Sequence, residues 1–119
     1  HLMVRQGLRA ILDAYADIEL VGEAGDGEEA VRLVGQWRPN VVVMDINMPR
    51  KNGSEATAEI KSRYPRTIVI GSSVNNGGDH HDAMMKAGAA MMITKGAAVE
   101  ELYGTIQQTL NRARTPEAD

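Results

Sequence analysis

The sequence predicts a single α/β domain, built on a parallel β-sheet with helices on both faces. Short apolar runs typical of buried strands alternate along the chain with segments whose apolar residues recur at helical spacing. Strands that alternate with helices form parallel sheets, and right-handed crossovers place the helices on both faces. The chain has 119 residues, 43% of them hydrophobic, which suits one domain with one ordinary core.

The first part of the chain predicts two helices and two strands. The turn residues Gly25-Asp26-Gly27 end the first strand, and Pro39 stops the second helix because proline cannot continue it. The expected elements are a helix over about residues 3–16, a strand from Ile18 to Ala24, a helix whose apolar stripe is Ala30, Leu33, Val34 and Trp37, and a strand at Val41–Met44 that is buried on both faces.

The second part predicts three helices and two strands, giving four strands and five helices in all. A loop over Asn47–Gly53 comes first, and Pro65 ends the helix that follows it. The expected elements are a helix over about Ser54–Tyr64, a strand at Thr67–Gly71, a helix over about Asp79–Ala87, a strand at Met91–Thr94, and a closing helix that carries Val99, Leu102, Ile106 and Leu110. The domain is expected to span residues 1–112, and residues 113–119 to begin a polar linker.

Composition excludes several classes of protein. The chain has no cysteine, so disulfide scaffolds, zinc ribbons and cysteine nucleophiles are impossible, and a reducing cytoplasm is the expected compartment. No apolar stretch is long enough to span a membrane, and we expect neither a signal peptide nor a membrane partner. The net charge of −3 argues against nucleic-acid binding by this chain alone.

Three chemically active side chains follow successive predicted strands. Asp45 comes directly after Val41–Met44, Ser72 and Ser73 follow the next strand, and Lys95 follows the last. Ligands of open parallel sheets bind at the carboxyl ends of the strands, so these side chains are expected on one patch. A carboxylate can attack a phosphoryl group, while an ammonium and a hydroxyl can hold its oxygens. Alone, each residue suits a turn, a cap or a solvated surface; together they predict a phosphoryl site.

The stretch Asp45-Ile46-Asn47-Met48-Pro49, followed by Asn52-Gly53, resembles the phosphorylation loop of bacterial two-component response-regulator receiver domains. The resemblance covers residues 1 to about 112 and implies a flavodoxin-like fold. The spacings from Asp45 to Ser73 and from Ser73 to Lys95 also fit the family. The stretches Val21–Ala30 and Lys86–Ala89 fit the family as well. Arg5–Leu8 and Gly96 resemble the corresponding residues of receivers that carry a C-terminal helix-turn-helix output domain.

The resemblance implies a role for each matching residue. Asp45 is the expected phospho-acceptor, charged from the phosphohistidine of a sensor histidine kinase. Ser73 and Lys95 are expected to contact the phosphoryl group, and the backbone carbonyl of Asn47 to join Asp45 in binding Mg²⁺. The module implied is a signalling protein rather than an enzyme, and it reaches DNA only through an output domain that this chain does not contain.

The chain departs from the family pattern at its start. In the family a central first strand ends in an acidic pair that binds Mg²⁺, and this pair would immediately precede His1. Asp13 and Asp26 lie on a helix and on a different loop, so they are not expected to replace it. We therefore expect weak Mg²⁺ binding, impaired phosphorylation, and a sheet that is rearranged or completed by a second chain in a homodimer. The alternative function is a receiver-derived fragment that self-associates and does not signal.

Two serines are atypical for a receiver. Ser54 opens the third helix where the family prefers a large apolar residue, and Ser72 stands in a strand where leucine is expected. A buried hydroxyl without a partner costs about 1–3 kcal/mol. The two serines indicate either natural drift or, in a truncated or engineered fragment, a repacked core.

A weaker alternative is a nucleotide-binding module. Gly25-Asp26-Gly27-Glu28-Glu29-Ala30 fits the glycine pattern of dinucleotide-binding turns. However, Glu28 and Glu29 would place negative charge where a pyrophosphate needs positive potential.

Overall fold

The computed structural model describes residues 14–19, 21–46, 51–73 and 79–114. Its elements in chain order are α2 (Gly27–Trp37), β1 (Val41–Asp45), α3 (Gly53–Arg63), β2 (Ile68–Ser73), α4 (Asp79–Ala87), β3 (Met91–Thr94) and α5 (Lys95–Arg114). None of the helices in these ranges is long and apolar enough to cross a bilayer.

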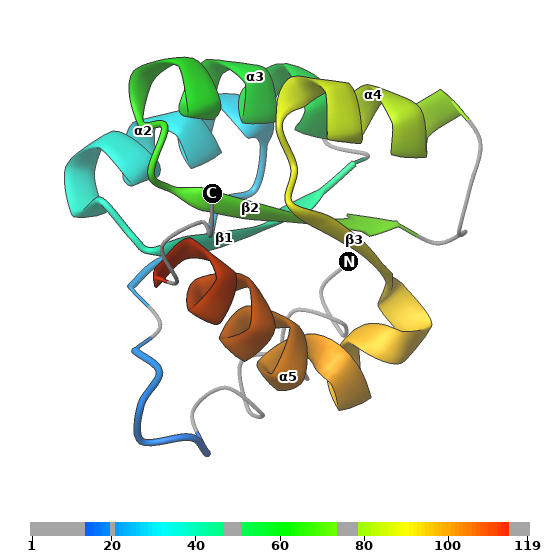
Figure 1. The fold of residues 1–119 in the computed structure, drawn as a ribbon. Coiled ribbons are helices and arrows are strands. Elements are labelled where there is room, and N and C mark those ends of the chain that lie inside the picture. Colours follow the sequence, from blue (N-terminus) through cyan, green and yellow to red (C-terminus); the bar gives the residue numbers. More distant parts are fainter. Residues whose placement is uncertain (1–13, 20, 47–50, 74–78, 115–119) are drawn as a thin grey trace, which may run out of the picture.

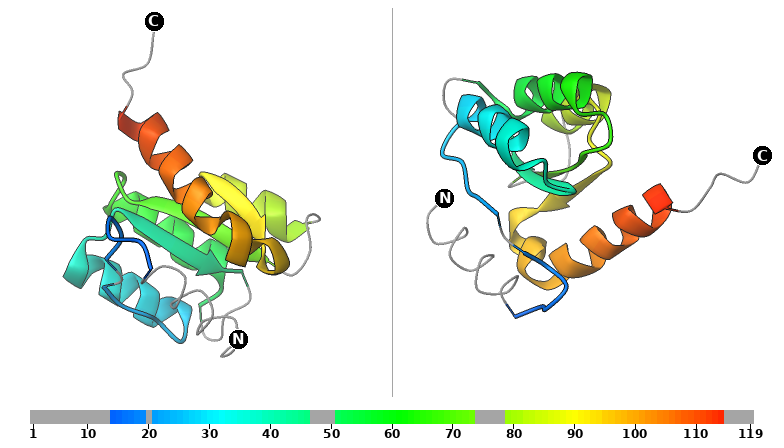
Figure 2. Two further views of the ribbon diagram at one scale, coloured as in Figure 1. Left: turned by 90° about the horizontal axis from the view of Figure 1, so that it is seen from below. Right: turned by 90° about the vertical axis from the view of Figure 1, so that its left-hand side faces the viewer.

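The three described strands form one parallel sheet between two layers of helices. The strand order is β1-β2-β3, and both pairings are parallel. Helices α2, α3 and α4 cover one face, and α5 covers the other (Figures 1 and 2). The α/β class, the parallel sheet and the helices on both faces are therefore confirmed.

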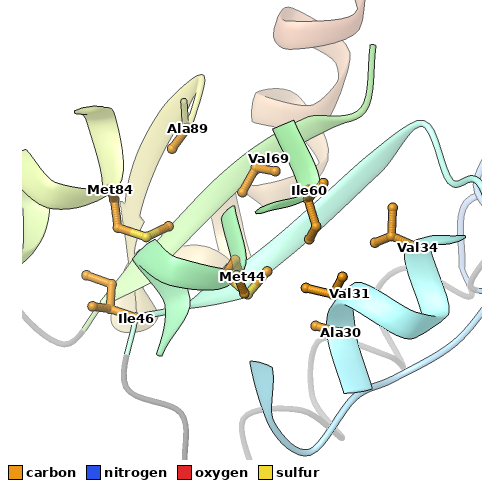
Figure 3. Close-up of a cluster of buried hydrophobic side chains, with 10 residues drawn as sticks. Ala30, Val31, Val34, Met44, Ile46, Ile60, Val69, Met84 and Ala89 are labelled. Atoms are coloured by element: carbon orange, nitrogen blue, oxygen red, sulfur yellow. The ribbon is translucent and has the colours of Figure 1, made fainter. Parts of the chain in front are cut away.

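Strand β2 supplies side chains to the cores on both faces of the sheet, because successive strand residues point in opposite directions. Val69 and Ile70 are both fully buried and belong to different clusters. The cluster beneath α2, α3 and α4 consists of Ala30, Val31, Val34, Met44, Ile46, Ala56, Ile60, Val69, Met84 and Ala89 (Figure 3). The cluster beneath α5 consists of Ile70, Ile93, Leu102 and Ile106.

Two helices begin at caps that the sequence encodes. The Asp26 carboxylate accepts a hydrogen bond from the Glu29 backbone N–H at 2.8 Å and so starts α2. Asn52 caps α3 in a capping box, in which Glu55 Oε1 accepts from the Asn52 backbone N–H in return. Such side chains satisfy amide groups that have no partner inside the helix.

The predicted strand from Ile18 to Ala24 is wrong for the described residues of that segment, which form no strand. A strand needs a hydrogen-bonded neighbour, and among the described strands β1 pairs with β2 alone. The residues just before this segment, Tyr15 and Asp17, contact α5. The Tyr15 ring stacks on the Tyr103 ring with 3.7 Å between centroids, and the Tyr103 hydroxyl donates to Asp17 at 2.7 Å.

The described residues therefore contain three strands and four helices, not the predicted four and five. The predicted first helix falls mainly on residues 1–13, outside the described ranges, and Ala14–Ala16 lie in a turn region. Trp37, which ends the predicted apolar stripe, is the last residue of α2 and is 52% exposed. Helix α5 continues to Arg114, two residues into the predicted linker.

Candidate functional site

The carboxyl ends of the three strands meet at one edge of the sheet. Asp45 is the last residue of β1 and pairs in register with Ser72 of β2. Ser73, the last residue of β2, pairs in register with Thr94 of β3. Lys95 follows at once as the first residue of α5. Neighbouring strands lie about 4.8 Å apart, so positions in the same register on β1, β2 and β3 fall within about 10 Å. The predicted convergence of Asp45, Ser72, Ser73 and Lys95 on one edge is present in the backbone.

Burial differs among these positions. Asp45 and Thr94 are half-buried, whereas Ser72 and Ser73 are buried at 5% and 9% exposure. The edge therefore presents a partly accessible carboxylate beside two hydroxyl groups of β2. Thr94 is a third hydroxyl at this edge that the sequence reasoning missed, because it was taken only as the end of a strand.

Gly53 lies against the end of β1. Its backbone N–H donates to the Ile46 carbonyl, one residue after Asp45, at 2.9 Å. A Cβ atom at Gly53 would collide with the Asp45 carbonyl oxygen and would lie 2.7 Å from Ile46 Cα. The residue is therefore glycine because the start of α3 presses directly on the backbone of the candidate acceptor.

Gly27 makes a second close approach near the same edge. A Cβ atom there would collide with the carbonyl oxygen of Lys51, so α2 begins in contact with the backbone before α3. The sequence motifs include both glycines, but no packing role was predicted for either. Each glycine is the first residue of its helix, which can be seen in the sequence. Only the tertiary packing shows that a side chain at either position would collide with a neighbouring backbone.

The Lys51 ammonium is bound away from the strand ends, by Glu59 on α3. Arg63 pairs with the same carboxylate, with 3.2 Å between Nη2 and Oε2. The hydrogen bond between Lys51 and Glu59 raises the pKa of Lys51 and lowers the pKa of Glu59. These charges therefore form a surface network that joins Lys51, just before α3, to the last turn of the helix.

Two of the predicted site groups lie outside the described residues. Asn47, whose carbonyl was expected to bind Mg²⁺, belongs to the stretch 47–50, and the side chain of Lys95 is likewise not described. Among the described residues no three His, Cys, Asp or Glu side chains are grouped closely enough to hold a metal ion. Because Mg²⁺ needs several oxygen ligands, the described donor set does not by itself fit this ion.

The interpretation of Ser54 as a core position is wrong. Ser54 is half-buried in the first turn of α3, and its hydroxyl donates to Asn52 Oδ1 at 2.9 Å. It therefore extends the helix cap. Ser72 is buried as expected, but in the described part of the chain no fully buried side-chain nitrogen or oxygen lacks a hydrogen-bond partner.

The glycine pattern at Gly25–Ala30 has a capping role. Asp26 accepts from the Glu29 amide, and the Glu29 carboxylate accepts from the Gly25 amide at 3.3 Å. The start of α2 is thus already occupied by two carboxylates of the chain itself, which compete with any bound phosphate.

Comparison with known proteins now assigns this arrangement to a family. The family described as response regulator receiver domain matches residues 1–107. The chain belongs to the response regulator receiver domain family. Among curated relatives, the receiver is 35% identical over 107 residues to the transcriptional regulatory protein DegU of Brevibacillus brevis, covering 90% of this chain and 45% of DegU. It is 38% identical over 109 residues to the transcriptional regulatory protein LiaR of Bacillus subtilis, covering 90% and 51%.

The receiver chain spans about half the length of these curated relatives. Among solved structures, the response regulator domain of Thermotoga maritima CheB superposes with a TM-score of 0.85 at 33% identity, covering 93% of this chain and 90% of that one. A LuxR-family two-component response regulator from Aurantimonas gives a TM-score of 0.86 at 30% identity, covering 94% and 80%. The flavodoxin-like receiver fold and the two-component signalling family predicted from the sequence are confirmed.

Proposed function

We propose that this receiver accepts a phosphoryl group on Asp45 from the phosphohistidine of a sensor histidine kinase and passes the change to a DNA-binding output domain. The observation that carries the proposal is the position of Asp45, half-buried at the carboxyl end of β1, with Ser72, Ser73 and the start of α5 on the same sheet edge. The curated relatives are named transcriptional regulatory proteins and are about twice as long as this chain. We place the protein in the cytoplasm, which the absence of cysteine supports.

In the proposed transfer, a carboxylate oxygen of Asp45 attacks the phosphorus atom. The bond between phosphorus and the imidazole nitrogen of the donor breaks, and that nitrogen keeps the electron pair and takes up a proton. The product is a mixed anhydride between the aspartyl carboxyl and the phosphoryl group. Nothing is oxidised or reduced, so no further reactant is required.

Hydroxyl and ammonium groups at the same edge would stabilise the charge of the transferred group. Ser73 and Lys95 are the proposed contacts. Ser72 is the register partner of Asp45, so its hydroxyl is the nearest competitor for the role of Ser73. Because adjacent strand residues point to opposite faces, only one of the two serines is expected to face the phosphoryl group.

Mg²⁺ would supply a positive charge that neutralises phosphoryl oxygens. Asp45 and the Asn47 carbonyl are the residues proposed to hold it. Since the described residues offer no group of three ligands, we propose that the chain of 119 residues binds Mg²⁺ weakly and is phosphorylated slowly. Titration with MgCl₂, followed by calorimetry, tests this; affinity matching that of a receiver with an acidic Mg²⁺-binding pair, measured in parallel, would contradict it.

The proposal is tested by incubating the chain with acetyl phosphate and Mg²⁺ and measuring its intact mass. We expect a phosphoryl adduct in the unaltered chain and none in Asp45→Asn. Asp82→Asn is the control, because Asp82 is exposed on α4. Ser73→Ala and Ser72→Ala then decide which hydroxyl contributes: only the one that contacts the phosphoryl group should slow adduct formation. An adduct that survives Asp45→Asn would refute the assignment.

A second candidate function is self-association without signalling, which the edge of the sheet favours. Among the described strands β1 pairs on one side only, and Val41, Val42 and Val43 are half-buried. An unpaired strand edge is a template for pairing with another chain, so a homodimer is proposed. Light scattering coupled to size exclusion chromatography tests this: a monomeric mass at micromolar concentration contradicts the dimer. A dimer that forms no aspartyl adduct supports self-association without signalling.

A further inference from the structure

A basic surface with an exposed tryptophan lies at the end of the sheet opposite Asp45. It is formed by the turn between α2 and β1 and the turn between α3 and β2, which lie side by side at the amino ends of the strands (Figure 1). The Ile68 amide donates to the Asn40 carbonyl at 2.9 Å, and the Arg38 guanidinium lies 4.4 Å from the centroid of the Tyr64 ring. Hence the two turns form one continuous surface, here named the 37/66 surface after Trp37 and Arg66.

The two turns that form the 37/66 surface carry basic residues and no acidic ones. No acidic residue occurs between Glu29 and Asp45, or between Glu59 and Asp79. Arg38 and Arg66 are exposed, and among the described residues neither has a carboxylate within ion-pair distance. In a chain of net charge −3, this is a local reversal of sign.

Helix dipoles account for only part of this charge. Lys61 and Arg63 are in the last turn of α3, where cations are favoured, and the Lys61 ammonium donates to the Pro65 and Thr67 carbonyls. The same explanation does not cover Arg66, which lies in the turn beyond the helix. The exposure of Trp37 is a separate feature that no helix dipole explains: the side chain is 52% exposed, although its burial would stabilise the fold.

Arg38 stands where the backbone would favour glycine. It is the C-cap of α2 with φ of 49°, and no other non-glycine residue among those described has a positive φ. Glycine adopts this conformation without steric cost. Arginine is therefore not required by the local backbone, and its guanidinium, held over Tyr64, offers further N–H donors to solvent.

We propose that the 37/66 surface binds an acidic segment of a protein partner, independently of phosphorylation at Asp45. Carboxylates of that segment pair with Arg38 and Arg66, and an apolar side chain packs on Trp37. Tryptophan and arginine are the residues most enriched where binding energy is concentrated in protein interfaces. A nucleic acid fits less well, because the acidic remainder of the molecule would repel its phosphates.

Trp37 makes the proposal directly measurable, because it is the only tryptophan of the chain. The probe is a synthetic peptide of alternating Glu and Leu residues without aromatic side chains, added while tryptophan emission is recorded. We expect a saturable change in emission that weakens as NaCl rises, since salt screens exposed charges. A peptide of alternating Lys and Leu should give no saturable change.

Arg38→Gly is the decisive variant, because glycine keeps the left-handed cap while the whole arginine side chain, with its guanidinium, is removed; unchanged circular dichroism verifies its fold. We expect about tenfold weaker binding of the acidic peptide. Arg112→Gln on α5 is the control, an exposed arginine in the other helix layer, and should bind as the unaltered chain does. Equal affinity of Arg38→Gly, no saturable response, or tighter binding of a duplex DNA than of the acidic peptide would each overturn the proposal.

Discussion

Two glycines near Asp45 are required by space rather than by backbone angle. Gly53 and Gly27 have no positive φ, yet a Cβ atom on either would collide with a carbonyl oxygen of the neighbouring segment. At Gly53 that oxygen belongs to Asp45 itself. The position of the candidate acceptor thus depends on the absence of a side chain at the start of α3.

Gly53→Ala is expected to destabilise the domain, by about 1–3 kcal/mol, because the new methyl group overpacks the Asp45 backbone. The matched control is Gly104→Ala on α5, where nothing lies within 4 Å of the added atom. That substitution should stabilise the protein by about 0.5–1 kcal/mol, as expected for an open helical site. Urea unfolding measures both; the same sign for the two variants would contradict the space argument.

At the scale of single elements, α3 is held by its N-terminal cap as well as by the burial of Ala56 and Ile60. Asn52 Oδ1 accepts from the Glu55 amide at 2.9 Å and from the Ser54 hydroxyl at the same distance. The Gly53 amide in the first turn of the helix donates to the Ile46 carbonyl, so this turn is tied to the residue that follows Asp45. The cap therefore contributes to the site as well as to the helix.

Asn52→Ala should lower the free energy of unfolding by about 1 kcal/mol, because two donors lose their acceptor. Asn52→Asp keeps an acceptor oxygen beside the positive end of the helix dipole and should retain most of the stability. Urea unfolding of the two variants under one set of conditions distinguishes them. Equal losses would mean that the amide group of Asn52, rather than its oxygen, is required.

Helix α5 is joined to the stretch before α2 by a polar contact. Asp17 accepts from the Tyr103 hydroxyl and, at 3.1 Å, from Gln107 Nε2. The hydrogen bond to Asp17 raises the pKa of Tyr103 above its ordinary value. A raised pKa in the folded state means that the contact stabilises the fold fully below the ordinary pKa of about 10, and this contribution is lost as pH rises through the folded value.

Tyr103→Phe removes that contact, so its cost should be visible near neutral pH and should shrink as pH rises above about 10. The difference in urea midpoint between the variant and the unaltered chain, followed across that range, measures the effect. Tyr15→Phe is the control, since the Tyr15 ring stacks on Tyr103 but its hydroxyl is not bonded to Asp17. A cost for Tyr103→Phe that does not change with pH would contradict its assignment to the hydrogen bond from the protonated hydroxyl.

At the scale of the whole molecule, β2 couples the two helical layers. Val69 contributes to the cluster beneath α3 and Ile70 to the cluster beneath α5, and both are fully buried. No other described strand has hydrogen-bonded neighbours on both sides. Loss of packing on one face is therefore transmitted to the other through the same strand.

Ile70→Ala should cost about 2–5 kcal/mol, and Ile70→Val about 0.5–1.5 kcal/mol. Because the layers share β2, amides of α3 on the opposite face should exchange faster in proportion to the global loss. Hydrogen exchange followed by mass spectrometry tests this. Unchanged protection of α3 in Ile70→Ala would show that the layers unfold separately.

The charges of the molecule are also separated at this scale. Asp26, Glu28, Glu29 and Asp45 lie toward the carboxyl ends of the strands, and Arg38 and Arg66 toward the amino ends. Oppositely charged ends give two surfaces that can recognise different partners without competing. The proposed phosphoryl site and the 37/66 surface occupy opposite ends of the sheet.

Local pattern was sufficient for most of the elements. Helix α4 and strand β3 have the predicted bounds, and α3 differs by one residue at each end. Strand β2 runs two residues beyond its apolar stretch, through Ser72 and Ser73, because these serines pair with Ile93 and Thr94. An apolar run indicates which residues are buried, whereas a strand ends where its backbone pairing ends. Asp45, Ser72 and Ser73 were therefore predicted just after the strands, although they belong to them.

The sequence by itself determined the family, the order of helices and strands, and the meeting of Asp45, the two serines and Lys95 at one edge. These follow from local periodicity and from residues in fixed order along the chain. Only the tertiary structure decided that residues 21–24 form no strand, that Ser54 caps a helix, and that Gly53 presses on Asp45. Each of these depends on which segments become neighbours in space, and one-dimensional pattern does not contain that information.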